Sequence, residues 1–130
     1  MNEAPTEDVR SGGLAAAISN LTVHLLSEYT GRGPTKARTH LSGDLVAVVL
    51  QDTMTKGERS LIRDGEHARV LETRQAYQRT MREDLAGGVA ELTGRQVVAF
   101  MSANHIDPDM GVEIFILAPE GAHDESGVAP

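Results

Sequence analysis

The chain has 130 residues, a mass of 13.9 kDa and a formal net charge of −7. This length predicts a single domain that is large enough to fold without disulfides. Because the sequence contains no cysteine, it excludes disulfide frameworks, iron–sulfur clusters, thiolate zinc sites and cysteine nucleophiles. It has no apolar run of about 18 residues, so we predict no membrane span. The polar, acidic first residues are unlike a signal peptide, which makes the cytoplasm the expected compartment.

The negative charge is concentrated at the two ends of the chain. Residues 1–13 carry a net charge of −2 and residues 119–130 a net charge of −3, while residues 14–118 carry the remaining −2. Both ends are rich in Gly, Pro, Ala and Ser and lack apolar periodicity, so we predict disordered acidic tails around one folded domain, residues 14–118. Since that domain is close to neutral, we predict no nucleic-acid partner.

The first predicted elements are a helix over residues 14–30 and a β-hairpin. The helix has apolar residues every three or four positions, at Leu14, Ile18, Leu21, Leu25 and Tyr29. Gly31 suits its C-cap, and Pro34 prevents its continuation. Residues 36–41 and 45–51 then predict two strands joined by a Ser-Gly-Asp turn. The second of them is apolar without alternation, which predicts burial of both its faces.

Two helices follow. Thr55 and Glu58 fit a capping box, in which the Thr55 hydroxyl accepts from the Glu58 amide and the Glu58 carboxylate accepts from the Thr55 amide. Gly65 separates a short helix, ending at about Arg63, from a long helix over about 66–93. The apolar stripe of the long helix comprises Val70, Tyr77, Met81, Leu85, Val89 and Leu92. The pair Gly87-Gly88 in the same helix predicts close helix packing or a kink.

The chain continues with strands over 96–102 and 112–117, joined by a loop over 104–111. The predicted order, α-β-β-(short α)-α-β-β, is typical of an α+β two-layer sandwich with a mainly antiparallel four-stranded sheet packed against two main helices. Two helices cover one face of such a sheet, yet three of its strands are apolar on both faces. We therefore expect a homodimer in which a second subunit covers the other face; helices divided between the two faces are the alternative.

A basic glycine loop after the first helix is the main candidate binding site. Its amides and cations could hold a carboxylate, phosphate or bicarbonate, and the residues concerned are Gly31, Arg32, Gly33, Lys36 and Arg38. However, the loop follows a helix C-terminus, whose dipole repels anions, and it lacks the phosphate-binding loop pattern. We favour the structural interpretation, a helix cap and turn with Arg32 paired to a carboxylate.

Arg74 interrupts the apolar stripe of the long helix. Because a buried arginine needs a partner, we favour an ion pair with Glu58 or another capping carboxylate. The functional alternative is a ligand-facing arginine that adds positive charge to the anion site.

The loop after the third strand resembles a metal site only superficially. The order of a calcium loop is absent from its candidate ligands, Asn104, His105, Asp107, Asp109 and Glu113. The Asp-Pro-Asp-Met-Gly run is a good hairpin turn by itself, and the five histidines form no helical zinc pair. Ser102 lies near His105 without a nucleophile elbow around it. We therefore predict no metal, no cofactor and no catalytic residue.

Several short motifs, taken in order, resemble one family of small prokaryotic proteins. They are Gly31-Arg32-Gly33-Pro34, Asp44-Leu45-Val46, Thr55 with Glu58, Arg74, Thr93-Gly94-Arg95 and Phe115. The family is that of the Na⁺-translocating membrane potential-generating system subunit MpsC, formerly a domain of unknown function. The resemblance covers about residues 14–118 and leaves both tails outside.

The resemblance implies a soluble accessory protein of a membrane system linked to ion translocation and inorganic carbon supply. Without a membrane span the chain can regulate, bind a ligand for or dock on a membrane-protein partner, but it cannot itself form the ion path. Our preferred hypothesis is a non-catalytic regulatory homodimer, peripheral to the membrane through that partner, which senses a small anion or docks on the partner.

Two other hypotheses remain open on the sequence alone. One is a small enzyme or ligand-binding protein with an arginine-lined anion pocket, in which Glu58, His105 or Asp107 acts as acid or base. Arg32 and Arg74 would then act as electrophiles, which requires these groups to converge in one concave pocket. The other is a purely structural dimerisation module.

Overall fold

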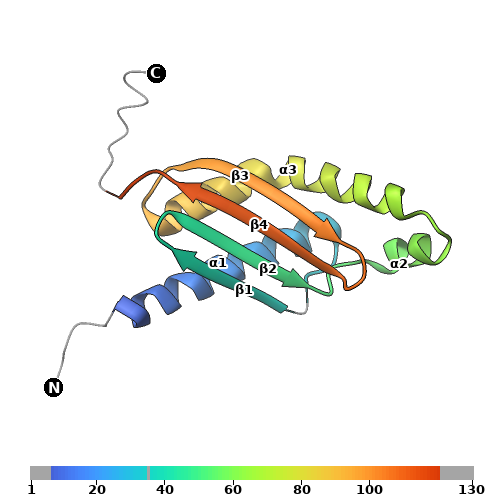
Figure 1. Cartoon of the computed structure of the whole chain (residues 1–130), viewed down its shortest axis with the longest axis horizontal. Coiled ribbons are helices and arrows are strands. Elements are labelled where there is room, and N and C mark those ends of the chain that lie inside the picture. Colours follow the sequence, from blue (N-terminus) through green and yellow to red (C-terminus); the bar gives the residue numbers. More distant parts are fainter. Residues whose placement is uncertain (1–6, 35, 121–130) are drawn as a thin grey trace.

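The computed structural model describes residues 7–34 and 36–120, and its elements follow the predicted order (Figure 1). They are α1 (Glu7–Thr30), β1 (Lys36–Ser42), β2 (Leu45–Gln51), α2 (Lys56–Arg63), α3 (His67–Thr93), β3 (Val97–His105) and β4 (Met110–Leu117). The predicted α+β fold, with a four-stranded sheet and helices packed on it, is confirmed.

The sheet is antiparallel throughout and has the strand order β1-β2-β4-β3. Each half of the chain supplies one hairpin, and the two hairpins join where β2 pairs with β4. In that central pair Val46 lies opposite Phe115 and Val48 lies opposite Glu113. Because side chains alternate between the faces of a strand, this register places Glu113 on the same face of the sheet as the apolar core.

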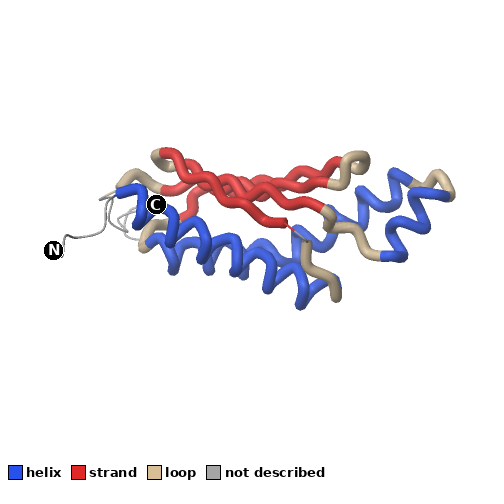
Figure 2. Tube along the Cα trace, turned by 90° about the horizontal axis from the view of Figure 1, so that it is seen from below, coloured by secondary structure: helices blue, strands red, loops and turns tan. Residues whose placement is uncertain are grey.

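The two long helices, α1 and α3, lie on one face of the sheet (Figure 2). α1 packs against β1 and β2, and α3 packs against β3 and against α1, while α2 lies beyond one end of the sheet (Figure 1). The alternative of helices divided between the two faces is therefore wrong. The opposite face carries no helix of the described residues.

The apolar core lies between the sheet and the two long helices. α1 and α3 contribute most of the stripes that the sequence predicts, but Leu92, predicted as part of the α3 stripe, is exposed. The sheet contributes every second residue of its central strands. The buried residues of this cluster are Ile18, Leu25, Leu26, Val46, Val48, Leu50, Met81, Leu85, Val89, Phe100, Phe115 and Leu117. The rings of Phe100 and Phe115 lie 4.9 Å apart, centroid to centroid, and join β3 to β4 across the core.

The Gly87-Gly88 pair marks close contact between the two long helices. A Cβ added at Gly88 would lie 2.6 Å from Cδ2 of Leu21, whereas one added at Gly87 would meet nothing within 4 Å. Gly88 thus allows α1 to approach α3, which confirms close packing as the explanation of this glycine.

Several boundaries differ from the predicted ones. α1 begins at Glu7, so residues 7–13, predicted as part of a disordered tail, are helical; Gly12 and Gly13 weaken a helix by about 1 kcal/mol each but do not forbid one. β3 continues to His105, so the predicted loop over 104–111 shortens to a turn because the two strands pair almost to its tip. The predictions for residues 1–6 and 121–130 lie outside the described residues.

The expectation that β2 is buried on both faces is also corrected. Its side chains alternate between buried and more accessible positions because the helices cover only one face. Across residues 7–34 and 36–120, no helix has both the length and the apolar character needed to cross a bilayer.

Candidate functional site

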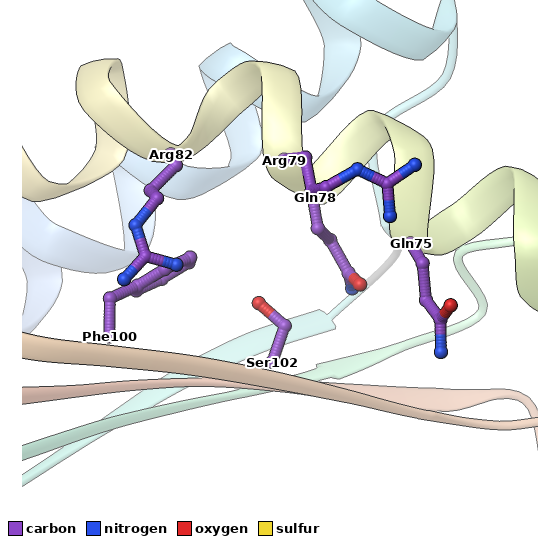
Figure 3. Close-up of a pocket in the computed structure, with 6 residues that line it drawn as sticks. All are labelled: Gln75, Gln78, Arg79, Arg82, Phe100 and Ser102. Atoms are coloured by element: carbon purple, nitrogen blue, oxygen red, sulfur yellow. The ribbon is translucent and has the colours of Figure 1, made fainter.

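A pocket of about 190 Å³ opens between α3 and β3, at the edge of the sheet (Figure 3). Its helical wall has the spacing i, i+3, i+4 and i+7, which is one face of an α-helix. Its other wall consists of alternate residues of β3, whose side chains point toward the helix. The lining residues are Gln75, Gln78, Arg79, Arg82, Phe100 and Ser102.

Two arginines give this pocket its charge. The guanidinium carbon of Arg82 lies 5.3 Å from the centre of the Phe100 ring, a cation–π contact that holds it against the strand. Within the described part of the chain, neither Arg79 nor Arg82 forms an ion pair with a carboxylate. The pocket is therefore a concave surface with two uncompensated positive charges.

A buried carboxylate lies behind the pocket. The Ser102 hydroxyl, on the pocket wall, donates a hydrogen bond to Oε1 of Glu113, and Nε2 of Gln78 lies 3.5 Å from Oε2 of the same carboxylate. Gln78 and Asn104 also exchange two side-chain hydrogen bonds of 3.0 Å each. These four polar side chains come from α3, β3 and β4, and they connect the pocket to the core.

Burial dominates the electrostatics of Glu113. Its side chain is only 1% exposed, and none of the described residues forms an ion pair with it. Burial raises the pKa of Glu113 to about 7, against the opposing effects of the Ser102 and Gln78 hydrogen bonds and of the more distant charge on Arg74. Glu113 can therefore gain or lose a proton near neutral pH.

Arg32, the central residue of the predicted anion loop, ties the end of α1 to the segment between β2 and α2. Its Nε donates to the carbonyl of Met54 at 2.9 Å, and its Nη2 lies 2.9 Å from the carboxylate of Asp52. The hydrogen bond from Arg32, aided by Arg59, lowers the pKa of Asp52 below its usual value. The structural interpretation of Arg32, a pairing with a nearby carboxylate, is confirmed.

The remaining loop candidates do not form one site with Arg32. Gly31 has φ +79° directly after α1, and a Cβ at Gly33 would lie 2.6 Å from the Ser27 hydroxyl, so both glycines have a backbone reason to be there. Lys36 and Arg38 are exposed on β1 and line a different concavity. Anion binding by these two cations stays a prediction.

Arg74 and Glu58 form a buried, two-hydrogen-bond ion pair. The distances are 2.9 Å from Nη2 to Oε1 and 3.2 Å from Nε to Oε2. Glu58 also accepts from the amide of Thr55 at 2.9 Å, while the Thr55 hydroxyl accepts from the amide of Glu58 at 3.1 Å, which completes the predicted capping box. The ion pair that we favoured for Arg74 is therefore confirmed.

The acid and base groups of the enzyme hypothesis do not converge. Glu58 is occupied by the cap and by Arg74, whereas His105 and Asp107 are exposed at the β3–β4 turn, where Nδ1 of His105 lies 2.9 Å from the Pro108 carbonyl. Asp109 accepts from Thr53 and from the Met54 amide. No group of three or more metal-ligating side chains occurs in the described residues.

Sequence reasoning missed the pocket between α3 and β3 as a unit. Two signals were available. Gln78 is four residues after Arg74 and three before Met81, so helical spacing places it on the apolar face of the long helix, and Glu113 is the one charged residue in the apolar strand 112–117. A polar residue among apolar ones in this way indicates either a structural network or a site.

Comparisons with known proteins identify a family. A family model described as "Na+-translocating membrane potential-generating system (MpsC)" matches residues 10–119, most of the chain. Searches of the curated proteins and of the solved structures returned no significant match.

Proposed function

Because the chain belongs to the MpsC family, we propose that it is a non-catalytic accessory or regulatory protein of a Na⁺-translocating, membrane-potential-generating system related to inorganic carbon supply. In this proposal it is a cytoplasmic homodimer that reaches the membrane through a protein partner. The observation that carries the proposal is the open face of the sheet, which is an apolar surface suited to another protein.

The open face is apolar at its centre. Its residues are the outward-pointing positions of β2, β3 and β4, and Met101 among them is 51% exposed and Leu45 38%. The apolar residues that the strand register places on this face are Leu45, Ala47, Val49, Ala99, Met101, Ala103, Met110, Val112, Ile114 and Ile116. A contiguous apolar face of this kind is typical of an interaction surface rather than of a solvated one.

Charge favours a second copy as the occupant. The outward positions of β1 carry Lys36, Arg38 and His40, and no outward strand position in the described sheet carries Asp or Glu. A symmetric pair that stacks β1 over the partner's β3 keeps the two basic edges apart and joins the two apolar centres. Face-to-face packing of two twisted sheets with aligned strands is a common arrangement. The helices would then face outward, available to a membrane-protein partner.

Light scattering at micromolar concentration tests the dimer. We expect about twice the 13.9 kDa mass of one chain. Met101→Glu should give the single-chain mass, because it places a charge in the interface, while Leu92→Glu should stay dimeric. Leu92 is 42% exposed on α3 and thus matches Met101 in exposure on the opposite layer. A single-chain mass for the wild type contradicts the dimer.

The role in the membrane system needs a cellular test. Deleting the gene should lower the membrane potential reported by a voltage-sensitive dye, and the wild-type chain should restore it. The Met101→Glu variant should restore it poorly if the dimer is the working form. An unchanged potential in the deletion strain, with inorganic carbon both scarce and ample, rejects the proposed role.

A further inference from the structure

The pocket between α3 and β3 has the chemistry of an anion site. Arg79 and Arg82 are four and seven residues after Gln75 on one face of α3, and their side chains flank that of Gln78 (Figure 3). Among the described residues, neither Glu83 nor Asp84, the acidic residues next to Arg82 in the sequence, lies within ion-pair distance of either arginine. Two guanidinium groups without a carboxylate, at one concave surface, are suited to a planar or tetrahedral oxyanion.

Ser102 connects this surface to the buried carboxylate of Glu113. While Glu113 is ionised, the Ser102 hydroxyl gives its only hydrogen to Oε1, so Ser102 presents only lone pairs to the pocket. A protonated Glu113 can donate to Ser102 instead, which releases the hydroxyl hydrogen toward the pocket. The second state offers an anion a donor where the first offers an acceptor.

We propose that this pocket binds a small oxyanion between Arg79 and Arg82, and that Glu113 takes up a proton from solvent when the anion binds. No covalent bond forms or breaks: the proton adds to Oε1 of Glu113, which donates to Oγ of Ser102, and the serine hydrogen turns toward the bound anion. The proton offsets one of the negative charges that the anion brings to the pocket.

The surroundings of Glu113 support the proton uptake. Burial raises the pKa of this carboxyl to about 7, so protonating it requires little free energy near neutral pH. The groups that line the small cavity around it come from α1, β2, the segment after β2, α3, β3 and β4, and they are Leu26, Thr30, Leu50, Thr53, Arg74, Tyr77, Gln78, Met81, Asn104 and Gly111. Of these only Arg74 and Tyr77 have ionisable side chains, and Arg74 is already paired with Glu58.

The size of the pocket limits the ligand. Its volume of about 190 Å³ corresponds to roughly six water molecules, at about 30 Å³ each. A phosphate, a bicarbonate or a small carboxylate fits this space, and a larger ligand would extend out of it into solvent.

The proposal adds a ligand to the proposed regulatory role, but it does not rest on the dimer. A single-chain mass with intact anion binding rejects the dimer alone, and a dimer without anion binding rejects this proposal alone. The two failures are therefore distinguishable.

Calorimetric titration of the full chain tests the site. Sulfate is the main probe because its charge is constant near neutral pH; phosphate and bicarbonate compare other oxyanions, and chloride controls for ionic strength. We expect saturable sulfate binding that weakens at least about tenfold in Arg79→Gln and in Arg82→Gln. Arg63→Gln, which removes the same charge from the exposed end of α2, should bind like the wild type.

The proton linkage has its own control. Wild-type affinity for sulfate should be several-fold higher at about pH 6 than at about pH 8, because a ligand and a proton that favour each other's binding do so reciprocally. Glu113→Gln, which can donate to Ser102 at any pH, should bind equally at both. Thermal unfolding confirms that each variant is folded.

Three results would overturn the proposal. Absence of saturable binding for every oxyanion, or an equal loss of affinity in Arg63→Gln and Arg79→Gln, rejects the site. A pH dependence that persists in Glu113→Gln rejects the role of Glu113.

Discussion

The guanidinium of Arg74 lies 2.9 Å from the carboxylate of Glu58, and each of the two side chains is about 10% exposed. Glu58 also completes the capping box at the start of α2, so a single carboxylate fixes both the N-terminus of α2 and its attachment to α3. Arg74, the buried arginine that interrupts the apolar stripe of α3, therefore serves to hold α2 against α3 through an ion pair.

Removing one partner of this ion pair should lower the free energy of unfolding strongly. Arg74→Leu leaves the Glu58 carboxylate buried without its cation, which destabilises a protein by about 3–5 kcal/mol. The double variant Arg74→Leu with Glu58→Leu should recover part of that loss, although it also removes the cap. Urea unfolding at neutral pH measures both variants. A loss below about 1 kcal/mol in the single variant would mean that water compensates the carboxylate.

Local rules explain why this pair was predictable and the pocket was not. Thr55 and Glu58 are three residues apart, and Arg74 lies on a stripe whose period is read directly from the sequence. Glu113 and Gln78 meet only because β4 pairs with β3 and α3 packs beneath them. A shift of one residue in the register would turn Glu113 to the other face of the sheet, and the sequence alone does not give that register.

The predicted start of α1 was wrong for a related reason. The glycines at positions 12 and 13 are weak helix formers, and propensity alone predicts an end of the helix near them. In the structure α1 nevertheless includes both glycines and begins at Glu7. A propensity argument weighs single residues, whereas a helix propagates cooperatively once it is formed.

Stability should fall as pH rises because of Glu113. Its pKa is raised from the ordinary 4.5 to about 7 by burial, so the native state holds this proton more tightly than the unfolded chain. Between these two values the native state binds more protons, and the free energy of unfolding decreases as pH increases. The total decrease is on the order of 3 kcal/mol, at about 1.4 kcal/mol for each unit of pKa difference.

Glu113→Gln isolates this effect from that of other titrating groups. The amide keeps hydrogen-bonding capacity toward Ser102 and Gln78 but has no proton to lose. We expect urea unfolding from about pH 4.5 to pH 8 to show a steeper decline in the wild type than in the variant, with the variant more stable at the upper end. Parallel curves for the two proteins would show that Glu113 titrates normally.

The two adjacent glycines of α3 should respond in opposite directions to alanine. Gly87→Ala adds a methyl group in open space and should stabilise the helix by about 0.5–1 kcal/mol, because alanine loses less backbone freedom on folding. Gly88→Ala places a Cβ 2.6 Å from Leu21 and should destabilise the chain by about 1 kcal/mol or more, since α1 must shift away. Thermal or urea unfolding of the pair compares them directly; equal stabilities would contradict the close helix contact.

The pairing of Arg32 with Asp52 should make stability depend on pH in the acid range. The Arg32 hydrogen bond is the main cause of the lowered pKa of Asp52, with Arg59 a further contributor. A carboxyl whose native pKa lies below its unfolded value of 3.8 contributes stability that is present above that value and is lost as pH falls through the native pKa.

Arg32→Gln should therefore lower stability at neutral pH and make the acid transition shallower, because Asp52 then titrates closer to its ordinary value. Lys36→Gln with Arg38→Gln removes two exposed charges from β1 and should leave both properties unchanged. Acid titration followed by circular dichroism gives the transitions, and sulfate calorimetry on the same proteins separates structure from binding. If Arg32→Gln keeps its stability and loses sulfate affinity, the loop after α1 is the anion site, and the structural explanation of Arg32 is wrong.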